Sequence, residues 1–560
     1  MVKRIINLLS KKQKKQGIWV VITMLIRSIL DFAGIAALVP VIFVISDKLG
    51  NERRLVLLLC CGVVLFVIFK NFLIYLLSRF QTKYQLDLYR DFSSRLFYNY
   101  YTRGLLFLKK HSSMQLAYEV NGICLTFSQS VIGSLFRIAG EGFLIILLVA
   151  ALIVWKPMMG VLTAALFIPI AAIYAVAVRK RVRELGKQSL DALRKQSRTV
   201  AETFRGYPEL EIANAFETSR NSFHSNLDAI VENRRSMEIY QLFPFFLSEM
   251  AVIAGLIFLA AFGGQDLVVT GGVFAVAAFR IIPAAKGVMN NYATLQNNIN
   301  SVEVIEKGIS PVSPDSKAEN TNAKTGSTAN EMQTDFQSET EQRLNFERKI
   351  TVREMDFAFP DGEKIIEQLN FEIKKGERIG IRGKSGSGKS TLFNLLLGFY
   401  DPTGGSLYID DIALTHANRK DWHRIVGYVP QEIFIIQGTL AHNIALGEEE
   451  IDLGKVWKVL EQVSLKDWAE NLKNGLDSDL GEFGSRLSGG QKQRIGIARA
   501  LYKGAKVLFF DEATSSLDGA TEKEINEALE ELSEKNDELT MIIIAHRESS
   551  LTFCDRIIDM

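Results

Sequence analysis

The chain has 560 residues, of which 48% are hydrophobic, and its formal net charge is +2. This length exceeds what one ordinary hydrophobic core organises, and the near balance of charge argues against a nucleic-acid partner. The cysteines offer no disulfide framework and indicate reduced thiols, because two are neighbours and two are isolated, at Cys60, Cys61, Cys124 and Cys554.

The first half of the chain contains six apolar runs, each long enough to span a bilayer, which takes about 20 residues. They lie near 17–46, 55–78, 129–155, 157–178, 241–263 and 266–288. The first run follows a basic N-terminus and is longer than the core of a signal peptide, about 7–15 residues, so we predict a retained anchor. The long connections, 79–128 and 179–240, are rich in Lys and Arg. The positive-inside rule therefore places both of them, and the N-terminus, in the cytoplasm.

Both long connections interleave apolar and charged residues, which predicts helical extensions of the spans into the cytoplasm. Each is interrupted once, at 111–121 and at 204–212. These breaks fit either a short transverse helix or a kinked connector, and the sequence favours neither.

A polar segment then separates two domains. Residues 308–345 are mostly Ser, Thr, Asn, Asp, Glu and Lys, a composition that does not fold by itself. We therefore predict an all-α transmembrane domain at 1–307, a linker at 308–345 and an α/β nucleotide-binding domain at 346–560.

The clearest motif of the second domain has the spacing G-x-x-x-x-G-K-[ST], between a strand-like run at 378–381 and a helix-like run at 391–397. Its glycines allow backbone N–H groups to converge on phosphate oxygens, Lys389 supplies a positive charge for the β- and γ-phosphates, and Ser390 offers a hydroxyl to Mg²⁺. A chance glycine-rich turn lacks this context. The predicted ATP-binding residues of the loop are Gly383, Lys384, Ser385, Gly386, Ser387, Gly388, Lys389, Ser390 and Thr391.

Two further motifs follow. Ser488, Gly489, Gly490 and Gln491 precede a helix beginning near Lys492, and the N–H groups of a helix N-terminus bind phosphate. The buried strand 507–510 then ends in two carboxylates, Asp511 and Glu512. We predict that Asp511 holds Mg²⁺ through water and that Glu512 polarises an attacking water.

In this order, and together with other matching positions, the motifs resemble those of ATP-binding cassette exporters over nearly the whole chain. The resemblance implies that Phe359, which replaces the usual tyrosine, stacks on adenine, that Gln431 senses Mg²⁺ and the membrane domain, and that His546 contacts the γ-phosphate. Asp518, in the run 515–518, would join a subunit interface. Members of this family usually continue beyond the position at which this sequence ends.

In this family ATP lies between the loop of one subunit and the signature, here 487–491, of the other. The resemblance therefore implies ATP and Mg²⁺ as ligands, and a dimer, for which a homodimer is the economical prediction. It also implies a multi-pass protein of the bacterial inner membrane with its ATPase domain in the cytoplasm. A soluble cassette protein would lack the six spans, and an importer commonly keeps its two parts on separate chains. An ATP-gated channel or regulator fits the architecture as well as a pump.

The substrate prediction rests on charges within the spans. Residues 279–292 resemble flippases of lipid-linked oligosaccharides, and a multidrug or peptide exporter is the alternative. The spacing i, i+4 predicts intrahelical pairs for Arg27 with Asp31 and for Arg137 with Glu141. Three other cations, Arg280, Lys70 and Lys286, have no such local acid. We expect Lys70 and Lys286 to snorkel, which leaves Arg280 as the substrate-cavity residue for an anionic lipid or glycolipid headgroup.

Overall fold

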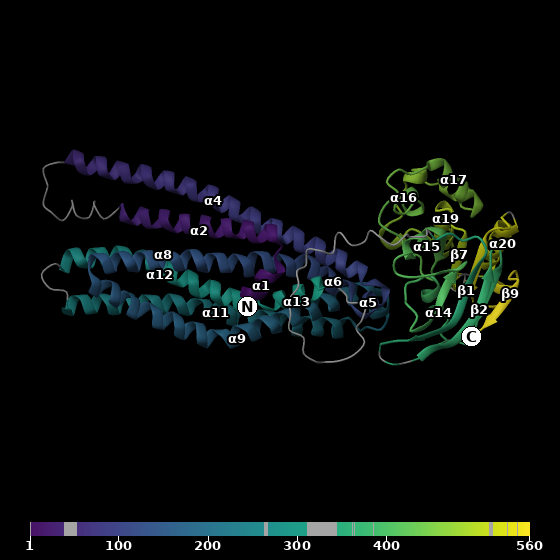
Figure 1. The fold of residues 1–560 in the computed structure, drawn as a ribbon, viewed down its shortest axis with the longest axis horizontal. Helices are drawn as coiled ribbons and strands as arrows, with labels where there is room; N and C mark the ends of the chain where they lie inside the picture. The colour runs from purple at the N-terminus through teal and green to yellow at the C-terminus, as the bar shows by residue number, and fades with distance from the viewer. Residues whose placement is uncertain are drawn as a thin grey trace. The chain divides into compact units, whose positions relative to one another are not determined.

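The computed structural model describes the chain except for Met1, 38–52, 263–266, 311–343, 514–518 and the single positions 361, 363, 385, 535 and 546. It forms two compact units, Met1–Lys317 and Ala318–Met560 (Figure 1). The predicted linker lies largely outside the described residues, as does the end of the first predicted span.

The first unit is helical throughout its described residues (Figure 1). Its α-helices are α1 (Val2–Leu8), α2 (Lys11–Ala36), α4 (Arg53–Thr102), α5 (Gly104–Lys110), α6 (Ser113–Tyr118), α7 (Cys124–Thr126), α8 (Gly133–Trp155), α9 (Pro157–Arg205), α10 (Tyr207–Ile212), α11 (Phe216–Phe262), α12 (Leu267–Asn297) and α13 (Asn300–Ile309). Two π-helical turns, Glu119–Ile123 and Phe127–Ile132, flank α7. Six stretches among the described residues are long and apolar enough to cross a membrane, at Lys11–Ala36, Leu57–Thr102, Ser113–Trp155, Pro157–Arg205, Phe216–Ile257 and Val273–Asn297.

Several of these helices far exceed the thickness of a bilayer. Helix α4 has 50 residues. At about 1.5 Å per residue it is about 75 Å long, against a hydrocarbon core of about 30 Å. The second predicted break contains the separate short helix α10, as one of the two interpretations expected. In the first break, α6 begins a helical stretch that continues to Trp155, so no separate short helix lies there. Pro208 lies in the first turn of α10, where its missing N–H costs no hydrogen bond.

Two apolar clusters hold this unit together. One joins α8, α9, α11 and α12 through residues such as Leu144, Tyr174 and Ile281. The other joins α4, the π-helical segment and α13, and includes Phe92 and Phe127, whose rings meet edge to face at 5.1 Å. Such edge-to-face contacts add to the free energy of apolar burial.

The second unit contains two sheets, an antiparallel one of order β2-β1-β4-β5 and a parallel one of order β6-β7-β8-β3-β9. The strands are β1 (Lys349–Ala358), β2 (Lys364–Lys374), β3 (Arg378–Arg382), β4 (Gly404–Ile409), β5 (Ile412–Ala413), β6 (Val426–Val429), β7 (Val507–Asp511), β8 (Thr540–Ile544) and β9 (Arg556–Asp559). The α-helices are α14 (Lys389–Leu396), α15 (Arg419–Ile425), α16 (Leu440–Ile444), α17 (Leu453–Gln462), α18 (Lys466–Glu470), α19 (Gly489–Tyr502) and α20 (Gly519–Glu534). Short 3₁₀ turns lie at Gly475–Asp477, Glu482–Gly484 and Glu548–Leu551.

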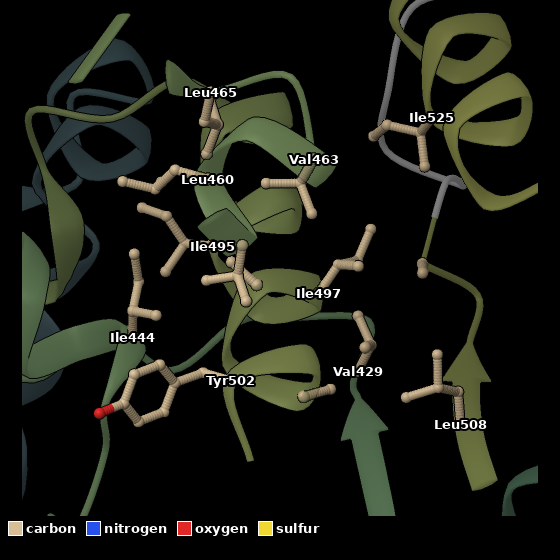
Figure 2. Close-up of a cluster of buried hydrophobic side chains, with 14 of the residues drawn as sticks. Val429, Ile444, Leu460, Val463, Leu465, Ile495, Ile497, Tyr502, Leu508 and Ile525 are labelled. Atoms are coloured by element: carbon tan, nitrogen blue, oxygen red, sulfur yellow. The ribbon is translucent and has the colours of Figure 1, made fainter. Parts of the chain in front are cut away.

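The parallel sheet is buried on both faces, so its central strands β7 and β8 are almost uniformly apolar. Helix α19 packs against β6 and shares a large core with α16 and α17, in which Leu460, Ile495 and Ile497 are buried (Figure 2). This core fixes the position of the N-terminus of α19, where the predicted signature lies.

Candidate functional site

The parallel sheet brings most of the predicted ATP-site residues to one edge. The glycine-rich loop follows β3, Gln431 follows β6, and Glu512 follows β7. The carboxyl ends of parallel strands meet at a single edge, which is where open α/β sheets bind their ligands. Ser385, Asp518 and His546 lie outside the described residues, so their predicted roles remain predictions.

The loop after β3 has the backbone shape of a phosphate cradle. Gly386 and Gly388 have φ values of +83° and +94°, which side chains with a Cβ rarely adopt. A Cβ on Gly388 would also approach Ile365 Cγ2 to 2.8 Å. The Ser387 hydroxyl is buried without a hydrogen-bond partner among the described atoms, and the first N–H groups of α14 have no acceptor one turn earlier in the helix. These free donors fit phosphate oxygens.

Lys389 places its charge inside this loop. Its side chain is buried, and its Nζ donates to the carbonyl oxygens of Gly383 at 2.8 Å and Lys384 at 3.0 Å. Ser390 and Thr391 follow in the first turn of α14. The ammonium group is therefore held at the position where a phosphate chain in the cradle would need a counter-charge.

Two carboxylates end β7 and are held from β6. The Tyr428 hydroxyl donates to Asp511 Oδ2 at 3.4 Å, and burial raises the pKa of Tyr428, which keeps the phenol protonated as a donor. Glu512 adopts φ +49°, and its N–H donates to Ile544 O at 2.9 Å. Left-handed backbone at a glutamate is strained, and such strain often accompanies a functional site.

Gln431 links these carboxylates to the signature helix. Its side-chain Nε2 donates to Glu512 Oε2 at 3.2 Å. Its backbone carbonyl oxygen accepts from Gln493 Nε2 of α19 at 3.0 Å. Sequence reasoning missed both Gln493 and Tyr428. The one signal for Tyr428 in the sequence is its hydroxyl group, because the other residues of strand β6 are apolar.

The oxygen donors predicted for Mg²⁺ fit a hard cation. Ser390 offers a hydroxyl, Gln431 an amide oxygen and Asp511 a carboxylate, which are ligand types that Mg²⁺ accepts. Among the described residues, no three His, Cys, Asp or Glu side chains gather as a metal cage. The residues present thus suit an ion that shares its coordination with phosphate oxygens and water.

Phe359 follows β1 in the other sheet and is only partly buried. Its ring meets those of Phe357 and Tyr400 at 5.1 and 6.2 Å, in both cases edge to face. Its orientation is thereby fixed by two neighbours that sequence reasoning did not identify. A fixed, partly exposed ring is suited to stacking on a planar base.

The signature residues have a structural role as well. Ser488 caps α19, since its Oγ accepts from Gln491 N at 3.2 Å while its own N–H donates to Gln491 Oε1 at 2.8 Å. This is a capping box, which the spacing of a serine and a glutamine three residues apart could have indicated. Gly489 and Gly490 form the first turn of the helix, so their N–H groups point out of its N-terminus.

The prediction for Arg280 needs correction. It has no acid one turn away in its own helix, as the sequence indicated, but its Nη2 lies 2.8 Å from Asp31 Oδ2 of another helix. Lys70 Nζ lies 3.1 Å from the other oxygen of the same carboxylate, and its side chain is only 14% exposed, so it does not snorkel. Arg27 pairs with Asp31 at 4.0 Å, as the i, i+4 spacing predicted. Arg137, expected to pair with Glu141, donates instead to Asn291 Oδ1 at 2.7 Å. Packing between helices brings these groups together, and spacing within one helix does not reveal it.

Comparisons with known proteins agree with this architecture. A family model described as ABC transporter matches residues 366–515. The ATP-dependent lipid A-core flippase of Ralstonia nicotianae is 30% identical over 407 residues, which cover 71% of this chain and 65% of that protein. The flippase of the same name from Francisella novicida is 28% identical over 472 residues, covering 81% of this chain and 74% of that protein.

A solved structure extends the comparison to the whole fold. It is that of a bacterial Atm1-family ABC exporter with ATP bound, with a TM-score of 0.77, 20% identity, and coverage of 98% of this chain and 94% of that chain. Residues 366–515 therefore match the ABC transporter family, and the whole chain has the fold of an ABC exporter. In its described residues, six helices long and apolar enough to cross a membrane precede one cassette domain. The predicted fold class is thereby confirmed.

Proposed function

We propose that this protein uses ATP to flip an anionic lipid-linked oligosaccharide or glycolipid outward across the bacterial inner membrane. The observation that carries the proposal is the charge around Asp31, where Lys70 and Arg280 contact a single carboxylate and Arg27 lies at the edge of contact. Asp31 and Glu141, whose charge acts on both Arg280 and Arg27, supply two negative charges for these three cations. Excess positive charge within a span is costly unless it meets an anion, and a phosphate headgroup supplies one. The names of the two flippases support a glycolipid substrate.

In the cassette domain, each residue has a proposed task. Lys389 and the loop N–H groups bind the phosphates of ATP, and Phe359 stacks on adenine. Bound Mg²⁺ would be held by Ser390, Gln431 and Asp511, and it neutralises phosphate charge. Glu512 orients the attacking water, with His546 on the γ-phosphate.

The same chain supplies only half of each ATP site. We propose a homodimer in which Ser488, Gly489, Gly490 and Gln491 of one subunit face the ATP held by the loop of the other, with Asp518 at the interface. Two-fold symmetry makes both sites equivalent. ATP binding would then close the cassette domains and hydrolysis reopen them, and the long cytoplasmic helices would transmit the movement to an alternating-access cavity.

Reconstitution tests the proposal. We expect proteoliposomes to translocate a polyprenyl-pyrophosphate glycan or a lipid A-core glycolipid when ATP is present. Arg280→Ala should slow translocation strongly and Arg280→Lys less so, because lysine keeps the charge but cannot form bidentate hydrogen bonds with a phosphate. Lys286→Gln on the same helix, whose ammonium lies 5.4 Å from the ring of Phe245, is the matched control.

The outcomes separate the competing functions. Equal translocation by all variants would remove Arg280 from the mechanism. Export of cationic drugs without glycolipid flipping would indicate a multidrug exporter. An ATP-dependent ionic current without net lipid movement would indicate a channel.

A further inference from the structure

The helical unit contains a second basic region, distinct from the cations that surround Asp31. A cavity of about 730 Å³ lies among the ends of α4 and α5, the start of the π-helical segment, the middle of α9, and α13. Figure 1 shows α5, α6 and α13 at the same end of the helical unit. All lining residues belong to this unit, between Tyr100 and Gly308. Its volume is in the range of small-molecule sites, about 300–1,000 Å³. We call it the basic cavity.

Helix α9 gives the basic cavity its charge. Lys180, Arg183, Lys187 and Arg194 recur at intervals of three, four and seven residues, which places them on one face of the helix, and all four line the cavity. Within the described part of the chain, the side chains of Lys180, Arg183 and Lys187 form no ion pair. The rim of the cavity therefore carries three positive charges that no direct ion pair engages in the described structure.

The acids that line the cavity neutralise only part of this charge. The lining contains six Lys or Arg residues and four Asp or Glu residues. Glu119 is already engaged, since it accepts from Arg194 Nη2 at 2.7 Å and from the Tyr100 hydroxyl at 2.6 Å. Glu303 is paired with Lys307 at 2.8 Å. An anion entering the cavity would therefore meet cations before it met a free carboxylate.

Three residues of the cavity wall contain buried donors without acceptors. Arg103 Nε, Arg194 Nε and Asn300 Nδ2 are buried and have no hydrogen-bond partner among the described atoms, and all three residues line the cavity. They come from three different segments, at the end of α4, in α9 and in α13. An unsatisfied buried donor costs about 1–3 kcal/mol. These atoms have almost no accessible surface, so they lie behind the cavity wall, where the two guanidinium groups add to its positive charge.

Aromatic rings complete one wall. The rings of Tyr100 and Phe107 are 5.5 Å apart, and those of Phe107 and His111 are 4.2 Å apart. The guanidinium of Arg103 lies 4.9 Å from the Phe107 ring, and its Nη2 donates to Lys307 O at 2.6 Å. These contacts fix the guanidinium of Arg103 in the cavity wall.

We propose that the basic cavity binds a phosphate-bearing anion, with Arg183 and Lys187 at its rim and Arg103, Arg194 and Asn300 in its wall. The ligand is either a soluble organic phosphate or the headgroup of an anionic lipid, since Lys180 follows closely on the apolar run of its helix. An occupant would bridge α9 and α13, and α13 is the last described helix before the cassette domain in sequence. It would thus hold two cytoplasmic helices together.

Calorimetry with inorganic tripolyphosphate tests the site in the full-length protein. The protein carries Lys389→Ala, to weaken phosphate binding at the glycine-rich loop, and is held in phosphatidylcholine nanodiscs. We expect one binding site per chain. Arg183→Gln with Lys187→Gln should weaken binding about tenfold or more, because charge-assisted contacts are lost. Lys195→Gln, an exposed lysine of α9 that does not line the cavity, should leave the affinity unchanged.

Nanodiscs that also contain phosphatidylglycerol distinguish the two sources. If lipid headgroups occupy the cavity, tripolyphosphate should bind more weakly in them, and this loss should vanish in the Arg183→Gln, Lys187→Gln protein. If the ligand is soluble, its affinity should be the same in both membranes. Absence of tripolyphosphate binding, or equal affinity in the double variant and the Lys195→Gln control, would overturn the proposal.

Discussion

Replacing Asp31 tests the charge network within the spans most directly. Its carboxylate is 11% exposed and contacts Arg280 at 2.8 Å and Lys70 at 3.1 Å. Two unit charges about 3 Å apart attract by about 5 kcal/mol at an effective dielectric constant of about 20, and the loss of hydration on burial offsets much of this. The net effect therefore depends on which partner is removed.

The variants should rank in a definite order. Asp31→Asn leaves both Arg280 and Lys70 without their carboxylate, which should cost about 3–5 kcal/mol of stability. Arg280→Gln leaves Asp31 paired with Lys70, so it should cost less, about 1–3 kcal/mol. The double variant leaves Lys70 and the more distant Arg27 without Asp31, and it should be more stable than Asp31→Asn alone. The two positions should thus couple by about 0.5–3 kcal/mol.

Thermal unfolding in detergent measures this order through the midpoint temperatures. Asp87→Asn is the matched control, because Asp87 lies on α4 and its contact with Arg90, at 3.6 Å, is well exposed and worth little. If Asp31→Asn were as stable as Asp87→Asn, or if the double variant lost the sum of the single losses, the reasoning would be refuted. A double variant that regains stability but not glycolipid translocation would indicate that Arg280 contacts the substrate in addition to Asp31.

Four further predictions concern the cassette domain. Glu512→Gln should bind MgATP but hydrolyse it about 10²–10⁴-fold more slowly, and it should accumulate closed dimers, because only the water-orienting group is lost. Residues 346–560 alone should be monomeric without nucleotide and weakly active, as sedimentation and ATPase assays would show. Ser488→Ala should destabilise that fragment by about 1 kcal/mol in urea unfolding, whereas Ser488→Asp should keep the cap yet lose ATPase activity in the full chain. Burial lowers the pKa of His423, so the fragment should lose stability as the pH falls below about 6.5, the ordinary pKa of histidine, towards the folded value.

Each of these has a contrary result. Near-normal ATPase activity of purified Glu512→Gln would refute its catalytic assignment, and a stable dimer of the fragment without ATP would contradict the second prediction. If Ser488→Asp hydrolysed ATP normally, Ser488 would act only as a cap. For His423, whose Nε2 lies 2.8 Å from Leu397 O, the control is His423→Gln, and an unchanged pH dependence in that variant would assign the effect to other groups.

Features that depend on neighbouring residues could be predicted from the sequence. The apolar runs predicted the spans, because a bilayer imposes length and hydrophobicity on each helix separately. The glycine-rich loop was recognisable because phosphate binding there uses consecutive backbone groups, and Gly386 and Gly388 have the positive φ that only glycine adopts easily. The roles of Ser385, Asp518 and His546 stay predictions from the sequence.

Features that join distant residues were decided by the tertiary structure. Asp31 and Arg280 are 249 positions apart, and only the packing of α2 and α12 against α8 brings them to 2.8 Å. Local spacing suggested Arg27 as the partner of Asp31 and left Arg280 free, because the period of one helix says nothing about the rotation of the next. The same reason explains why Tyr428 beside Asp511 escaped prediction. The sequence by itself therefore determined which segments cross the membrane and which loop is shaped for phosphate, whereas the register between helices and strands decided which charges meet.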